Sequence, residues 1–556
     1  MKAASSPPTL RTTASGLPGR AVLFRLRLLI AVCALACTWA LAQPPQRLID
    51  YAAAVGVHPE DPRIPNVGTP RFGGVFTYAH NETLASLDAH KSAAATTVTL
   101  NIHFAEGLFA LDATGTSRPD LVDSYTVSDD GTVYTFSLRQ GVPFHNGEIL
   151  GAADVVASLQ RWFGGTLGSQ AARYISELNV VDQYTVEIVL TEPYPFIIYQ
   201  LTVPQTSGAY IYPRSQIEAV GDGTIDTPIA TGPYYVADVR EGDYVRLVRF
   251  DDYVGRVEPP SGFAGGRVAY LDEIIIQTVP DAIVRMAGVE TGQFDKAHNA
   301  TNDMYSLYAN RPDIRPRIAM GSFATAQFNK RQGPMTDQRL RLAFNYAIDV
   351  RQIVAAAGPP EFTEANSSLA PRDDPWYTPV GEDVYLGYDP EYARALLAEA
   401  GYNGEPIRWL VDPSVASYYT SAQVAVPMLE AVGFNIQLVP MDAATLRTMR
   451  NDETAYEVYA QGLGWRADPA ALTNLSDSNP GWWVTEEKTR ILEAMRLEQD
   501  FDKRYALWEE LHAHMYDYMP AVKFETFGSL SLERAAYSGA FQAWAYVDFI
   551  NTWLND

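Results

Sequence analysis

Residues 125–162 read YTVSDDGTVYTFSLRQGVPFHNGEILGAADVVASLQRW. A turn at 129–131 separates two apolar segments, because short polar side chains and a glycine accept turn conformations. Apolar and polar residues then alternate through residues 134–139, which predicts a strand with one buried face. After a second turn at 144–147, apolar residues recur at helical spacing from 153 to 162 and predict an amphipathic helix. The segment is therefore a strand-turn-helix unit typical of an α/β protein.

This segment resembles the signature of extracellular solute-binding protein family 5, whose members deliver peptides, nickel and related solutes to ABC importers. The family pattern combines a Ser-x-Asp-Gly turn, an aromatic-rich strand ending Leu-Arg, a Phe-His-(Asp/Asn)-Gly turn and an Asp-Val-Val helix. All four parts stand here, although Gly151-Ala152 replaces the usual Thr-Ala before the helix. Shorter similar motifs cover most of the remaining chain: Ser86-Leu87-Asp88, Thr231-Gly232-Pro233-Tyr234, Gly292 to Asp295, Arg341 to Asp349 and Leu396 to Tyr402.

The resemblance implies an α/β, two-lobed periplasmic-binding-protein (Venus flytrap) fold with mixed sheets and a hinge between the lobes. The residue pattern agrees, since Ile274, Ile275 and Ile276 predict a doubly buried strand and residues 337–349 an amphipathic helix. We expect hinges near 323–329 and 524–528. The expected domains are a signal peptide at 1–42, an extended linker at 43–68, a first lobe at 69–322 with a subdomain at about 90–195, a second lobe at 323–527 and a return to the first lobe at 528–556.

The first 42 residues have the pattern of a secretory signal peptide. They carry five cations and no acid, and then an uncharged run from Leu28 to Ala42 that ends Ala-Leu-Ala. This run is too short for a permanent membrane anchor, so we predict cleavage before Gln43 and a periplasmic or extracellular location.

Both cysteines, Cys33 and Cys37, lie inside this leader, so the exported chain would contain neither disulfides nor thiolate ligands. Lipid attachment at Cys37 is the alternative. It is disfavoured because the leucine usually found three residues before a lipidated cysteine is missing.

The chain is strongly acidic, with a formal net charge of −24. Without the five leader cations, the 42 basic residues fall to 37 against 66 acidic ones, which gives −29. Such a surface repels phosphate backbones and anionic lipid heads, so we expect no nucleic-acid partner and no membrane-surface binding.

The segment from Gly464 to Pro469 is the candidate ligand site in the second lobe. Oligopeptide-binding members of the family carry Gly-Trp-x-x-Asp here, which implies that Trp465 lines the cleft and that Asp468 takes the ligand's α-ammonium. The family's second Asp-Pro, a few residues later, is replaced by Ala470-Ala471-Leu472. Asp468-Pro469 could therefore correspond to the family's second Asp-Pro after a deletion. In that case this segment would contain no aspartate that binds the ligand's α-ammonium.

Three further residues are candidate ligand contacts. Arg466 could bind a ligand carboxylate through two hydrogen bonds, or could form an ion pair within the protein. Asn81 and Glu82 resemble first-lobe residues that contact the ligand backbone, although a loop glutamate is more often only solvated.

No sequence motif indicates an enzyme, a cofactor or a metal site. G-x-S-x-G, H-E-x-x-H and GxxxxGK[ST] are absent, and His512 and His514, two apart on a helix predicted from 507 to 518, point in different directions.

The sequence therefore predicts a monomeric receptor, not an enzyme, that captures a peptide and hands it to an ABC permease and its ATPase subunits. A same-fold receptor for a nickel or metal chelate, an opine or an oligosaccharide stays open, with Trp465, Trp482 and Trp483 suited to sugar stacking unless they are core. A secreted hydrolase using paired carboxylates is the alternative of a different class.

Overall fold

The computed structural model describes residues 44–57, 64, 68–204, 208–544 and 546–555. Apart from Pro44, these residues belong to one compact unit formed by residues 45–556. The predicted signal peptide, its two cysteines and the cleavage site before Gln43 lie outside the described residues.

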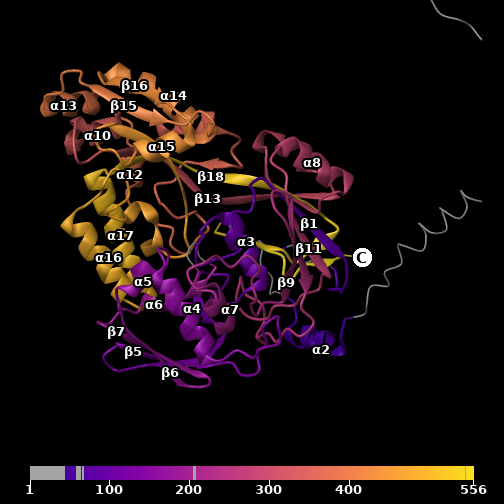
Figure 1. Ribbon diagram of the computed structural model, residues 1–556. Helices are drawn as coiled ribbons and strands as arrows, with labels where there is room; N and C mark the ends of the chain where they lie inside the picture. Colours follow the sequence, from indigo (N-terminus) through magenta and orange to yellow (C-terminus); the bar gives the residue numbers. More distant parts are fainter. Residues whose placement is uncertain (1–43, 58–63, 65–67, 205–207, 545, 556) are drawn as a thin grey trace, which may run out of the picture. The chain divides into compact units, whose positions relative to one another are not determined.

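A mixed sheet of eleven strands runs through the described chain (Figure 1). Two long antiparallel strands, β13 (Ile314–Phe328) and β18 (Ala521–Arg534), lie side by side at its centre. The strand order is β16-β15-β17-β13-β18-β12-β1-β11-β10-β9, and β14 (Thr363–Glu364) pairs with β18. Both predicted hinge segments lie in these central strands, where Phe323 pairs with Thr526. The hinge itself stays a prediction.

The first-lobe half of the sheet is built around β1 (Val75–His80), which is parallel to β11 (Glu273–Thr278) and to β12 (Lys296–Ala300). Helix α8 (Ala282–Thr291) connects β11 to β12 and ends at Gly292, whose φ of 77° suits a glycine. The strand predicted at 274–276 is confirmed, but burial on both faces is not, because Ile274 and Ile276 are buried whereas Ile275 is only partly buried. Antiparallel β10 (Tyr244–Arg249) and β9 (Tyr234–Arg240) complete this half.

The opening sequence segment forms part of a separate four-stranded antiparallel sheet. Its order is β4 (Val122–Val127), β5 (Val133–Leu138), β7 (Thr185–Leu190) and β6 (Ile175–Asp182), with α4 (Ala152–Gly164) packed on it. The predicted strand and helix are confirmed. The missing threonine cap is compensated, because the Asp154 carboxylate accepts a hydrogen bond of 2.9 Å from the Gly151 N–H.

The second-lobe half contains three parallel strands, β15 (Pro406–Val411), β16 (Asn435–Pro440) and β17 (Val458–Gly464). Helices α10 (Gln338–Tyr346), α13 (Pro390–Ala400) and α14 (Ala416–Val432) gather around β15 and β16 (Figure 1). The predicted helix starts are confirmed, because Asp337 and Asp389 accept hydrogen bonds from the backbone of the first turns of α10 and α13. Helices α16 (Glu486–Leu497) and α17 (Phe501–Tyr518) pack against each other, and α17 begins six residues before its predicted start.

The prediction of an extended linker is corrected for part of its length, because α2 (Gln46–Val55) is a helix. Val55 is buried with Val268, Tyr270 and Trp553, and this packing stabilises a helix that the proline-rich flanks had obscured.

The C-terminal residues return to the first-lobe core, where Phe541, Tyr546 and Phe549 are buried. The other elements are α3 (Ala95–Phe104), β2 (Phe109–Leu111), β3 (Ser117–Pro119), α5 (Ser169–Ala172), α6 (Ile197–Gln200), β8 (Thr202–Val203), α7 (Arg214–Val220), η1 (Asn302–Met304), α9 (Tyr305–Tyr308), η2 (Pro334–Thr336), α11 (Val350–Ala357), α12 (Glu382–Tyr385), α15 (Ala443–Met449), η3 (Pro469–Ala471), η4 (Thr473–Leu475), β19 (Tyr537–Ser538), β20 (Phe541–Ala543), β21 (Tyr546–Asp548) and β22 (Trp553–Leu554).

Candidate ligand-binding site

Ligands of open α/β sheets bind beyond the carboxyl ends of parallel strands, where backbone and loop polar groups converge. The first lobe offers such an edge at the ends of β1, β11 and β12. The second lobe offers one at the ends of β15, β16 and β17. All five residues predicted to bind ligand follow one of these strands, Asn81 and Glu82 after β1 and Trp465, Arg466 and Asp468 after β17.

At the first-lobe edge, Asn81 lies beside a pair of stacked histidines. The rings of His80 and His298 are 4.7 Å apart and nearly parallel. Burial lowers the pKa of both rings, that of His298 to about 3, so both are neutral at physiological pH. Within the described residues, Asn81 Oδ1 and His298 Nδ1 are buried without a hydrogen-bond partner. The sequence prediction missed both histidines, although His80 directly precedes Asn81.

Glu82 is exposed and borders a hollow of about 70 Å³ beside the β9–β10 hairpin. Its backbone N–H donates to His80 Nδ1 over 3.1 Å. Among the described residues, no hydrogen bond or ion pair joins Asn81 or Glu82 to residues 465–468.

At the second-lobe edge, Trp465 is buried and donates its indole Nε1–H to Asp374 Oδ2 over 2.7 Å. The Trp544 side chain also hydrogen-bonds this carboxylate. Trp544 stands at the tip of the β20–β21 hairpin with a left-handed φ of 49°, and it packs against the cores of both lobes. Burial raises the pKa of Asp374 to about 6. One partly buried carboxylate thus joins Trp465, which follows β17, to Trp544 at the tip of the β20–β21 hairpin.

Asp468 is buried and already has partners inside the protein. Its Oδ2 is 2.7 Å from Arg504 Nη2 on α17, and its Oδ1 accepts from the Ala470 N–H at the start of η3. Arg466 is partly buried and donates to the Tyr546 hydroxyl over 3.3 Å. The ligand-binding roles of these residues stay predictions.

Two adjoining crevices lie between first-lobe and second-lobe residues, and Asp468 lines the smaller of them. One, of about 310 Å³, has Tyr134, Phe196 and Tyr199 on one side and Trp376 and Arg504 on the other. The other, of about 620 Å³, shares Tyr134 and Arg496 with it. Both have the size of a small-molecule site and an aromatic lining.

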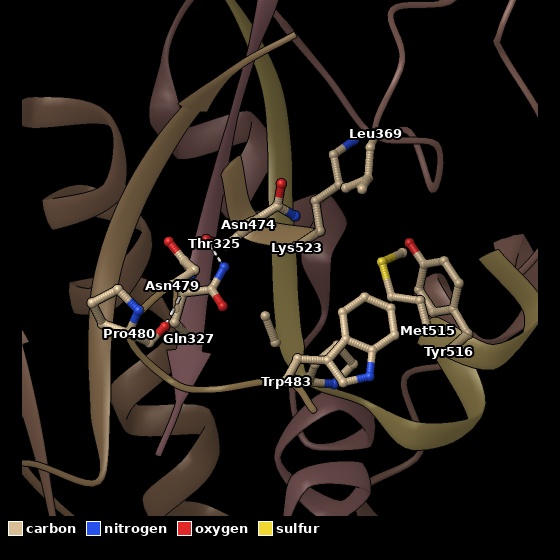
Figure 2. A pocket seen from close by; sticks show the side chains of 12 residues that line it. Thr325, Gln327, Leu369, Asn474, Asn479, Pro480, Trp483, Met515, Tyr516 and Lys523 are labelled. Carbon is tan, nitrogen blue, oxygen red and sulfur yellow. Dashed lines mark hydrogen bonds between the residues drawn. The ribbon is translucent and has the colours of Figure 1, made fainter. Parts of the chain in front are cut away.

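A further cavity lies within the second lobe between Gln327, Trp483 and Lys523 (Figure 2). Its volume of about 20 Å³ suffices for one water molecule and not for a solute. Trp482 and Trp483 are both buried, Trp482 in a cluster with Tyr456 and Trp483 in the main core of this lobe, which favours the core interpretation over sugar stacking. In the described part of the chain, no group of three or more His, Cys, Asp or Glu side chains could hold a metal ion.

A polar strand edge in each half of the sheet and the continuous central strands β13 and β18 agree with a two-lobed architecture. The family model described as bacterial extracellular solute-binding proteins, family 5 (middle), matches residues 116–483, and the chain belongs to this family. The family consists of transport-binding proteins, as predicted from the sequence.

Relatives agree over most of the chain. A probable peptide ABC transporter periplasmic-binding protein (y4tO) of Sinorhizobium fredii is 28% identical over 468 residues, 79% of this chain and 86% of the relative. The glutathione-binding protein GsiB of Salmonella paratyphi A is 29% identical over 419 residues, 71% and 76% of the two chains. The crystal structure of a dipeptide-binding protein from Pseudoalteromonas sp. SM9913 with Met-Leu superposes with a TM-score of 0.72 at 19% identity, covering 87% of this chain and all of that one, and confirms the two-lobed fold.

Proposed function

We propose that this protein captures a peptide in the cleft between its lobes and delivers it to the permease of an ABC importer. The observation that carries the proposal is the pair of polar strand edges, one in each lobe, and two aromatic-lined crevices lie elsewhere between first-lobe and second-lobe residues. Peptides suit this arrangement because their amides, ammonium and carboxylate need buried polar partners, whereas their side chains need apolar walls. Two relatives named for peptide or glutathione binding support the same ligand class.

A thermal-shift panel tests the ligand class. It contains di-, tri- and tetrapeptides, glutathione, nickel–histidine and maltotriose. A ligand that binds only the folded protein stabilises it by about 2.7 kcal/mol at 100 times its Kd. We expect the peptides, including glutathione, to raise Tm. Nickel–histidine and maltotriose should leave Tm unchanged. A shift by nickel or sugar alone, or cleavage of a peptide during incubation, would contradict the proposal.

We further propose that the protein works outside the cytoplasm after removal of residues 1–42. No helix within the described residues is long and apolar enough to cross a membrane. N-terminal sequencing of the exported protein should begin at Gln43, and a diacylated Cys37 would replace this proposal with a lipid anchor.

A further inference from the structure

Asp412 is a buried carboxylate with one unused oxygen. It directly follows β15 at the carboxyl edge of the second lobe, and only 3% of its surface is exposed. Its Oδ1 accepts from the Ser414 N–H over 2.9 Å and from the Ser414 hydroxyl over 2.7 Å. Its Oδ2 has no hydrogen-bond or ion-pair partner among the described residues. A buried carboxylate oxygen without a partner is costly, so a native protein that keeps one needs a reason for it.

The surroundings of Asp412 form a hollow of about 350 Å³ at the ends of two parallel strands, β15 and β16. Asp442, the other acid of the hollow, is exposed, and both of its oxygens accept hydrogen bonds from Ala444 and Thr445 at the start of α15. The hollow is lined by Asp412, Pro413, Ser414, Pro440, Met441 and Asp442. Asp412 is therefore the acid of the hollow with a buried oxygen that has no partner among the described residues.

Tyr418 connects Asp412 to the segment that carries Trp465. Burial and the nearby Asp412 carboxylate raise the pKa of Tyr418. The same ring packs on β17 at Gly462, where an added Cβ would come within 3.0 Å of Tyr418 Cε1. Gly462 lies three residues before Trp465, so Asp412 shares one strand edge with the predicted ligand residues.

The contrast with Asp468 decides between the two carboxylates. Both oxygens of Asp468 already contact the Arg504 guanidinium, so an external cation would compete with that ion pair. Arg447 and Arg450 also lie near Tyr418, yet neither forms an ion pair with Asp412 in the described chain. Asp412 can accept a cation without breaking an existing bond.

We propose that Asp412, rather than Asp468, takes the α-ammonium group of the captured peptide. This assignment rests on the proposed function and specifies one contact of that site. A charge-assisted hydrogen bond from an ammonium to a desolvated carboxylate is short and strong, so this contact would select ligands with a free amino terminus.

Calorimetry tests the assignment with Met-Leu, tri-alanine and tetra-alanine, each in free and N-acetylated form. The proteins are wild type, Asp412→Asn, Asp468→Asn and Asp452→Asn. Asp452 is the matched control, because it is exposed in the same lobe and its Oδ1 accepts from the N–H and hydroxyl of Thr454 as Asp412 does from Ser414.

In wild type we expect the free peptide to bind at least 30-fold more tightly than the acetylated one, the order of magnitude for a desolvated charge pair. Asp412→Asn should weaken the free peptide about 30-fold and abolish this preference, whereas Asp452→Asn and Asp468→Asn should keep it. A preference that survives Asp412→Asn, or disappears in Asp468→Asn instead, overturns the assignment. Equal binding of both forms by wild type overturns it while the proposed function stands, and binding of no peptide overturns both.

Discussion

At the scale of single residues, the candidate site contains parts that the sequence motif could identify and parts that it could not. Trp465 follows from the Gly-Trp motif, and the structure buries it at the expected strand end. Asp374, which accepts its indole N–H, lies 91 residues earlier in a stretch without a motif. The partner of Asp468 was likewise unpredictable, because Arg504 becomes its neighbour only when α17 packs beside η3. Long-range pairing of this kind leaves no local pattern.

Asp374 predicts a pH dependence of stability. Its pKa is raised to about 6 in the folded protein against 3.8 in the unfolded chain, so the ionised carboxylate destabilises the fold above pH 6. As pH falls through 6 toward 4, the folded protein takes up the proton first and gains stability, by about 3 kcal/mol at most.

Asp374→Asn removes this titration. We expect the free energy of unfolding of wild type, relative to that of Asp374→Asn, to rise as the pH of urea titrations falls from 7.5 to 4.5. Asp373→Asn, at an exposed neighbouring position, removes a like charge that helps to raise the pKa of Asp374, so it should show the same rise at a reduced size. A constant difference between wild type and Asp374→Asn would contradict the raised pKa.

At the scale of elements, local signals predicted most helices and strands but not their pairing. Helices begin at Asp337 and Asp389 and end at Gly292 and Gly401 through capping preferences that act within one turn. Helix α2 was missed because its stability comes from distant residues such as Trp553. The antiparallel pairing of β13 with β18 joins segments about 200 residues apart and could be expected only from the family resemblance.

Arg341 links elements of the second lobe and gives an element-scale prediction. Its buried guanidinium donates to the carbonyl oxygens of Met335, Thr336, Tyr518 and Met519, which fixes α10 to η2 and to the end of α17. A lysine ammonium cannot reach four carbonyls in this planar arrangement. Arg341→Lys should therefore cost about 3 kcal/mol or more in urea unfolding, because buried carbonyls lose charge-assisted hydrogen bonds.

Arg339→Lys provides the comparison on the same helix. Its side chain is 42% exposed and pairs with Asp337, so its replacement should cost less than about 1 kcal/mol. Equal losses in the two variants would show that the Arg341 contacts do not stabilise the lobe.

At the scale of the whole molecule, the central strands and the Asp374–Trp465–Trp544 contact point to one functional property. The lobes share continuous strands β13 and β18 and also contact each other at a separate point, the hairpin tip at Trp544. Two lobes joined in this way can open and close around a ligand that contacts both, because the ligand stabilises only the arrangement in which both strand edges reach it. On this proposal, ligand capture and closure form a single equilibrium.

Small-angle X-ray scattering with and without a saturating peptide from the thermal-shift panel tests this claim most directly. A peptide bound between the lobes should raise Tm and reduce the radius of gyration together, and Asp452→Asn should behave like wild type. A peptide that raises Tm while the radius of gyration stays unchanged would contradict closure of the two lobes around their ligand.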